Sequence, residues 1–173
     1  MKVYLQFSGR KVAPFNDPVG ETPIGNRPLR DWMAETFKEA GLQPIESLEP
    51  PCLIVPDNVF CTAGALTQFI KGAAGRDAVL VLKRSRVGRL VTHVQPTVVE
   101  TDDGWRFPSI RFVSGSEQEP VDVVIDPEEH TIDFTIRNPY LGNENIELGL
   151  ARHPVMTINH WVHILWANQT CGA

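Results

Sequence analysis

A short apolar run, a long interrupted loop and an amphipathic segment open this chain and most constrain its fold. Residues 2–7 have strand-like composition, residues 8–28 are broken by glycine and proline, and residues 28–40 carry apolar side chains at helical spacing. A proline begins the predicted helix and Gly41 follows its end, which is the usual asymmetry of a helix. A strand, a basic glycine-containing loop and a helix in this order are typical of a phosphate-binding site.

The segments that follow predict an α/β fold with a Rossmann-like, mostly parallel sheet. Residues 52–55 and 78–82 are short, continuous apolar runs that suit buried parallel strands, and residues 62–71 between them have helical periodicity. Strands that alternate with helices in this way form βαβ units, and ligands bind at the carboxyl ends of their strands. We therefore expect the loop after residue 7 and Asp57 to lie at one edge of the sheet.

The pattern changes after residue 86, and strand-like segments separated by turns then predominate. These segments are residues 90–100, 105–107, 121–125 and 131–136. Residues 138–143 have the composition of a loop. We expect residues 1–173 to form a single domain, with a nucleotide-binding half at 1–86, a β-rich half at 87–155 and a C-terminal amphipathic helix at 156–170.

The first half of the chain resembles the N-terminal, GT-A-like region of sugar-phosphate nucleotidyltransferases. The residues that carry this resemblance are Gly9, Lys11, Pro14, the phrase Gly25-Asn26-Arg27-Pro28-Leu29, and the apolar residues 53–60 around Asp57. In that family the glycine loop binds the phosphates of a nucleotide, and the phrase at residues 25–29 begins the first helix. The aspartate at the end of the second motif holds Mg²⁺.

The resemblance implies an enzyme that transfers a nucleotide from a nucleoside triphosphate to a sugar-1-phosphate, with Mg²⁺ as cofactor. Lys11 and Asp57 would then be the catalytic residues, and Asp57 would also be the metal ligand. Gly9 and Arg10 would cradle the triphosphate, and Arg27 would supply a further cation for phosphate. From its position alone, Asp57 could equally be the cap of the helix that follows it.

This chain departs from the family pattern in ways that leave activity open. Its loop has few glycines, Val19 stands where the family has a lysine after proline, and the interval before Asp57 is too short for the family's additional βα unit. No motif identifies the second metal-binding acid, for which Asp126 and Asp133 are candidates. A relative that binds a nucleotide-sugar without catalysis is therefore an alternative to the enzyme.

The C-terminal segment suggests a different kind of function. Its apolar residues at helical spacing are Ile158, Trp161, Val162, Leu165 and Trp166. A helix with two tryptophans more often belongs to a core or an interface than to a cofactor site. The second alternative is therefore an interaction or assembly module that docks a partner, or a second copy of the chain, through the helix of Trp161 and Trp166.

Two histidines and one cysteine are further candidates for sites of chemistry. His160 and His163 are one turn apart, but no carboxylate stands at ligand spacing in that segment, so we expect hydrogen-bonded imidazoles rather than a metal site. Cys61 precedes a predicted helix, where a thiolate would be stabilised. Because no histidine partner is identifiable, we expect Cys61 to be a small buried residue.

Composition excludes several classes of function. The formal charge is −5, and the densest basic run is residues 83–86, so a nucleic-acid partner is not expected. No apolar run approaches the ~18 residues that a membrane span requires. The three cysteines form no C-x-x-C pair and no secretion signal is evident, which together predict a cytoplasmic protein.

Overall fold

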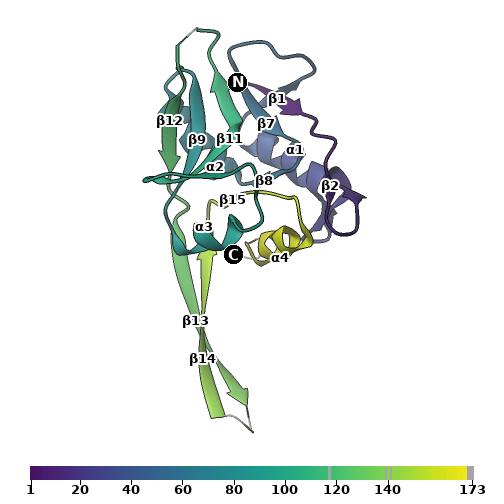
Figure 1. The fold of residues 1–173 in the computed structure, drawn as a ribbon, viewed down its shortest axis with the longest axis vertical. Helices are drawn as coiled ribbons and strands as arrows, with labels where there is room; N and C mark the ends of the chain where they lie inside the picture. Colours follow the sequence, from purple (N-terminus) through teal and green to yellow (C-terminus); the bar gives the residue numbers. More distant parts are fainter. Residues whose placement is uncertain (117, 139, 141, 171–173) are drawn as a thin grey trace.

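The computed structural model describes residues 1–116, 118–138, 140 and 142–170. One sheet organises the fold, and Figure 1 shows it in the upper part of the molecule. Its strands are β1 (Lys2–Gln6), β6 (Gln43–Ile45), β7 (Cys52–Pro56), β9 (Ala78–Lys83), β10 (Val99–Glu100), β11 (Gly104–Val113) and β12 (Val121–Ile125). The order across the sheet is β12-β9-β11-β7-β1-β6, and β10 pairs with β11 beside this path.

The sheet is mixed. β1 runs parallel to β6 and β7, and β12 runs parallel to β9. Between these two groups lies β11, which is antiparallel to both β7 and β9 and shifts register between Phe107 and Arg111. The predicted α/β class is therefore confirmed, whereas a Rossmann-like, mostly parallel sheet is not.

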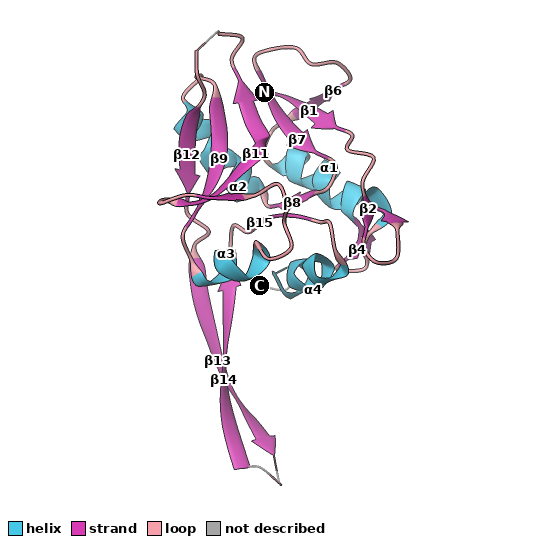
Figure 2. Ribbon diagram, in the orientation of Figure 1, coloured by secondary structure: helices cyan, strands magenta, loops and turns pink. Residues whose placement is uncertain are grey.

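Both helices predicted in the first half are present. They are α1 (Leu29–Glu39) and α2 (Ala63–Ala73), which contact each other and lie behind the sheet in Figure 2. The hydroxyl of Thr62 accepts a hydrogen bond from the Ala65 amide and caps α2. Phe37 of α1 and Phe69 of α2 are buried in the core, so helical spacing of apolar residues correctly identified the inward faces.

The segment predicted as a loop between β1 and α1 contains two small hairpins. In the first, β2 (Lys11–Val12) pairs with β3 (Asp17–Pro18), and in the second, β4 (Pro23–Ile24) pairs with β5 (Arg27–Pro28). The 3₁₀ helix η1 (Val19–Glu21) connects them. These pairs are short, so their local signal is indistinguishable from that of the surrounding glycine and proline turns.

The prediction of a strand at residues 90–100 is wrong. The chain there first completes the helix α3 (Arg86–Val91), and only β10 at the end of the segment is extended. The hydroxyl of Ser85 caps α3 by accepting a hydrogen bond from Gly88 N at 2.9 Å. This cap favours a helical turn over the strand that the valines of this segment suggest.

A long hairpin projects from the body of the molecule in Figure 1. It consists of β13 (Glu129–Asn138) and β14 (Gly142–Ala151), which pair along their whole lengths. The strand predicted at residues 131–136 lies within β13, whereas β14 has no predicted counterpart. Residues 139 and 141 of the predicted loop lie outside the described residues.

The predicted terminal helix begins later than expected. Val155–Thr157 forms the strand β15, which pairs with β8 (Val59–Cys61), and the helix α4 covers Trp161–Thr170. The prediction that the apolar residues at helical spacing form the buried face is only partly correct. α4 buries His163 and Ala167, whereas Trp161 is exposed. No helix in the described part of the chain is long and apolar enough to cross a bilayer.

Candidate functional site

The loop after β1 and the turn after β7 meet at one edge of the sheet. β1 and β7 are parallel neighbours, so both strands end on the same side. The Asp57 amide donates to the Gln6 carbonyl at 3.0 Å, and Asp57 Oδ1 accepts from Ser8 N at 3.0 Å and Ser8 Oγ at 2.5 Å. Asp57 therefore holds the loop in place, and it is not a helix cap, because Thr62 caps α2.

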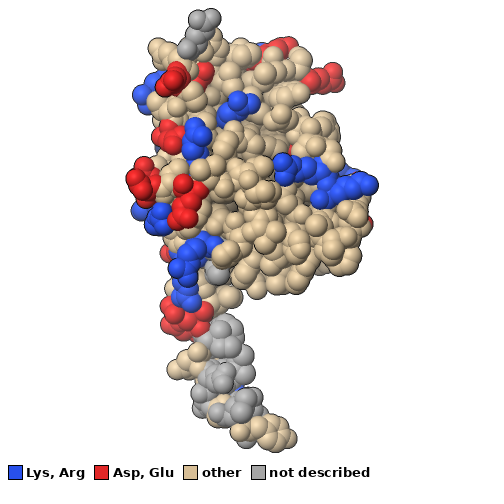
Figure 3. All heavy atoms as spheres, viewed as in Figure 1, with Lys and Arg blue, Asp and Glu red and all other residues tan. Residues whose placement is uncertain are grey.

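Four of the five predicted site residues come together there. Gly9, Arg10, Lys11 and Asp57 line a cavity of about 460 Å³, here called the loop cavity. Gly9 has a φ of +62°, which lets the loop turn back so that the Arg10 amide donates to Ser8 Oγ at 3.2 Å. Figure 3 shows basic side chains gathered over β2, beside this loop.

Arg27, the fifth predicted residue, does not join them. Its guanidinium lies 4.2 Å from the centre of the Trp32 ring, and its Nη2 is 2.6 Å from a carboxylate oxygen of Glu35. Arg27 lines neither the loop cavity nor the cavity described next. The first turns of α1 supply its partners, so Arg27 packs against that helix and lies apart from the other four predicted site residues.

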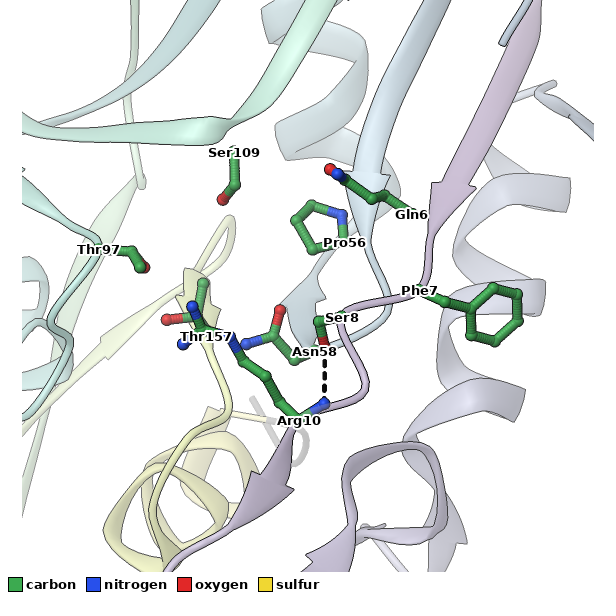
Figure 4. A pocket seen from close by; sticks show the side chains of 9 residues that line it. All are labelled: Gln6, Phe7, Ser8, Arg10, Pro56, Asn58, Thr97, Ser109 and Thr157. Carbon is green, nitrogen blue, oxygen red and sulfur yellow. Dashed lines mark hydrogen bonds between the residues drawn. The ribbon is translucent and has the colours of Figure 1, made fainter. Parts of the chain in front are cut away.

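A second cavity of about 340 Å³ opens on the other side of the loop, and Figure 4 shows its lining side chains. This polar cavity is lined by Gln6, Phe7, Ser8, Arg10, Pro56, Asn58, Thr97, Ser109 and Thr157. Arg10 lies on the walls of both cavities, and in Figure 4 it extends toward Asn58 and Thr157. Asn58 could have been found from its place at the end of β7, whereas no sequence signal marks Thr97, Ser109 or Thr157.

A hydrogen-bond network anchors Arg10 to the C-terminal part of the chain. Asn159 Oδ1 accepts from Arg10 Nη1 at 3.2 Å and from Asn58 Nδ2 at 2.8 Å. Asn159 Nδ2 donates to Thr157 Oγ1 at 2.9 Å, and Thr157 Oγ1 donates to Gln95 Oε1 at 2.7 Å. The side-chain amide of Asn159 therefore fixes the position of the Arg10 guanidinium. No sequence motif identifies Asn159 as a site residue.

Backbone hydrogen bonds attach the same segment to both loops. The Ile158 amide donates to the Asn58 carbonyl at 2.6 Å. Ala13 N donates to Asn159 O at 3.1 Å, and Trp161 N donates to Ala13 O at 2.9 Å. Residues 158–161 consequently connect the turn after β7 to the hairpin after β1, and the walls of the polar cavity come from distant parts of the chain.

His163 holds the start of α4 in this arrangement. Its side chain is fully buried, its Nδ1 accepts from Asn159 N at 3.0 Å and His160 N at 3.2 Å, and its Nε2 lies 2.7 Å from the His93 carbonyl. Two amides on Nδ1 require the neutral tautomer with the proton on Nε2. His163 is thus a structural, hydrogen-bonded histidine, as expected, and burial lowers its pKa, although the bond to the His93 carbonyl opposes that shift.

The lowered pKa of His163 predicts a loss of stability in mild acid. Below the ordinary pKa of about 6.5, the unfolded chain binds a proton at this position that the folded chain excludes. The free energy of unfolding should therefore fall as the pH drops from 7 to 5, by at most about 1.4 kcal/mol per pH unit for this one group. Urea titrations at these two pH values measure the change.

A matched pair of variants identifies the group responsible. His163→Gln should lose most of the difference between the two pH values, whereas His160→Gln should keep it. His160 is only half-buried, and its ring accepts one amide, from Val162 at 3.3 Å. A pH difference that persists unchanged in His163→Gln would contradict this assignment.

The fit of Mg²⁺ can be tested on the carboxylates present. Oδ1 of Asp57 accepts both hydrogen bonds from Ser8, which leaves Oδ2 as one acidic ligand on a residue that lines the loop cavity. Asp126 instead pairs with Lys83 at 2.8 Å, which lowers the pKa of its carboxyl, and Asp133 lies on the projecting β13, so neither joins Asp57. Among the described residues no group of three potential ligands surrounds a metal position. One carboxylate suits a magnesium ion that a nucleotide's phosphates also hold.

Cys61 has no features of a nucleophile. It lies in β8 with an exposed fraction of 5 %, and burial raises the pKa of its thiol to about 12. Its carbonyl accepts a hydrogen bond from Thr36 Oγ1 at 3.2 Å. The expectation of a small buried residue therefore fits its environment.

The chain was also compared with known proteins. Neither the protein-family models nor the curated proteins compared with it gave a match.

Proposed function

We propose that this chain is a nucleotidyltransferase-like protein that binds a nucleoside triphosphate or a nucleotide-sugar at the carboxyl ends of β1 and β7. Arg10 would bind a phosphate between the two cavities, and the polar cavity would hold the sugar or base. Its volume of about 340 Å³ lies within the ~300–1,000 Å³ typical of small-molecule sites.

The observation that carries this proposal is the chemistry of the polar cavity's wall. Arg10 is its one positive side chain, and no carboxylate lines it among the described residues. The other polar groups are neutral amides and hydroxyls, namely Gln6, Ser8, Asn58, Thr97, Ser109 and Thr157. A fixed guanidinium beside uncharged donors and acceptors favours a ligand that joins an anion to a hydroxyl-rich or amide-bearing group.

The loop cavity would take the remaining phosphates. Lys11 is exposed and forms no ion pair with a described residue, so its ammonium is available to an anion. Arg30 also lines this cavity, but it is engaged by Glu21. Asp57 would hold the Mg²⁺ that a triphosphate carries, and that ion would neutralise charge on the phosphates during transfer. Positioning by Arg10 and Lys11 would be the chain's own contribution.

Ligand-induced stabilisation tests the proposal. Nucleoside triphosphates and nucleotide-sugars, each with and without Mg²⁺, should raise the thermal midpoint of the native chain, since a ligand at a hundred times its Kd adds about 2.7 kcal/mol. Arg10→Ala removes a charge-assisted hydrogen bond of about 1.5–3 kcal/mol, so it should weaken binding roughly 10- to 100-fold. Isothermal titration of both proteins gives this ratio.

Arg76→Ala is the matched control. Arg76 is exposed, forms no ion pair among the described residues and lines neither cavity, so its removal should leave affinity unchanged. Equal affinity in Arg10→Ala and the native chain, or no response to any nucleotide, would contradict the proposal.

One observation favours the interaction module as a second candidate. Trp161 and Leu165 are one turn apart on α4, and each has an exposed fraction of 46 %. Tryptophan is among the residues that contribute most to binding at protein interfaces. In this case the chain would not respond to nucleotides, and Trp161→Ser would abolish association with its partner.

A further inference from the structure

The projecting hairpin of β13 and β14, here called the arm, has an unpaired edge. The two strands pair over ten residue positions from Glu129 to Asn138, and β13 pairs with no other strand in the described part of the chain. In Figure 1 the arm extends away from the sheet and the helices. A two-stranded ribbon is marginally stable in water, and an open edge is a template for another strand.

The register of the arm divides its residues into two faces. Partners in an antiparallel pair share a face, and faces alternate along each strand. Ile132 pairs with Leu148 on an apolar face, and Ile132 is 46 % exposed. On the other face Asp133 pairs with Glu147, so two carboxylates stand directly opposite each other. Like charges in this position are unfavourable. Arg86 pairs with Glu147 at 3.2 Å, whereas Asp133 forms no ion pair with a described residue.

We propose that β13 pairs antiparallel with β13 of a second copy of the chain, around a two-fold axis at Thr135. The result is a four-stranded intermolecular sheet with the order β14-β13-β13-β14. In this register Asp133 of each copy faces Arg137 of the other, so two opposite-charge pairs form. Thr135 then lies opposite Thr135 of the other copy, at the two-fold axis.

The charges select this edge and this register. Asp133 and Arg137 are exposed and form no ion pair with any described residue, so both are available. With the two-fold axis at residue 134 or 136, Asp133 no longer lies opposite Arg137, so both charge pairs are lost. The apolar faces of the two copies would still lie on the same side of the sheet. β14 carries Glu144 and Glu147 but no lysine or arginine, so pairing of β14 with itself offers no such complement. Charge complementarity therefore favours a second copy bound through β13.

Charge reversal tests this register. Asp133→Arg places two arginines opposite each other at both symmetric positions, and Arg137→Asp does the same with carboxylates. Each single variant should raise the dimer dissociation constant about tenfold or more, measured by sedimentation velocity over a concentration series. The double variant restores both pairs with reversed polarity and should return to within about threefold of the native value.

The arm itself should tolerate these changes. Asp133→Arg places a cation opposite Glu147, which removes the like-charge pair within the arm. Loss of the dimer in this variant therefore does not arise from an unfolded arm. A native chain that stays monomeric at all concentrations would overturn the proposal. A dimer that responds equally to the single and double variants, or to neither, would do so as well.

Crosslinking locates the two-fold axis. In a Cys171→Ser background, where Cys52 and Cys61 are buried, Thr135→Cys should form an intermolecular disulfide on mild oxidation. Asn145→Cys is the matched control, because Asn145 is the pairing partner of Thr135 and accepts its hydroxyl at 2.9 Å. The two copies of Asn145 would lie three strand spacings apart, roughly 14 Å, which is too far for a disulfide. Equal crosslinking of both variants would contradict the proposed axis.

Discussion

His163→Ala should lower the free energy of unfolding by about 3–5 kcal/mol, measured by urea denaturation at pH 7.5. The imidazole is fully buried and satisfies the amides of Asn159 and His160 as well as the His93 carbonyl. Alanine leaves these groups without partners and opens a cavity in their place. Both effects destabilise, because unsatisfied buried groups typically cost ~1–3 kcal/mol each.

The same variant should also weaken the candidate site. His163 accepts a hydrogen bond from the backbone amide of Asn159. The side-chain oxygen of Asn159 in turn orients Arg10 and Asn58. We expect nucleotide affinity to fall even at temperatures where the variant remains folded. His160→Ala is the control, because its half-buried ring accepts only a long bond from Val162, and it should cost less than about 1 kcal/mol. Similar losses in the two variants would show that His163 has no special role.

Gly104→Ala should cost about 3 kcal/mol or more, for a reason that involves backbone rather than side chains. Gly104 begins β11 opposite Lys83 of β9 and has a φ of +156°. An added Cβ would lie 2.0 Å from the Leu82 carbonyl oxygen and 2.9 Å from the Arg84 amide nitrogen. Because neither atom can move without separating the two strands, the substitution must displace the central antiparallel strand. Guanidinium denaturation measures the cost.

Gly149→Ala is the control for this substitution. Gly149 also lies in a paired strand, but a Cβ there would be 3.5 Å from Val87 Cγ2, which is an ordinary contact. Its effect should lie within about 0.5 kcal/mol of zero. A Gly104→Ala protein as stable as Gly149→Ala would contradict the close approach of β11 to β9.

The elements predicted correctly are those whose signals are local. β7 and β9 are continuous apolar runs, and α1 and α2 have apolar residues at helical spacing with well-defined ends. β1 and β7 are parallel neighbours, and such strands end at the same edge of a sheet. The prediction that Asp57 lies beside the loop after β1 follows from this rule. This part of the candidate site required no knowledge of distant contacts.

The elements that were missed depend on distant partners. Nothing in the sequence of β11 indicates that it inserts antiparallel between β7 and β9, because strand order carries no local signal. β14 contains asparagines, glutamates and glycines that are poor strand formers, and its pairing with β13 determines its conformation. β15 is short and overlaps the start of the predicted helix at residues 156–170, and its pairing with β8 makes it a strand.

The same distinction applies to single residues in the site. Asn159 is separated from Arg10 by 149 positions in the chain, so its role depends on the tertiary fold. The phrase at residues 25–29 predicts that Arg27 contributes a cation for phosphate. In the folded chain the nearby Trp32 and Glu35 engage its guanidinium, which a linear motif does not reveal.

The central claim is that a nucleotide's phosphates bind at the loop after β1. Amide chemical-shift mapping tests it most directly, since a chain of 19.3 kDa is suited to solution NMR. Titration with a nucleoside triphosphate and Mg²⁺ should shift the amides of Gly9, Arg10, Asp57 and Asn58 most strongly. Unchanged spectra, or shifts confined to α4 and to the arginines of residues 84–89, would contradict the claim.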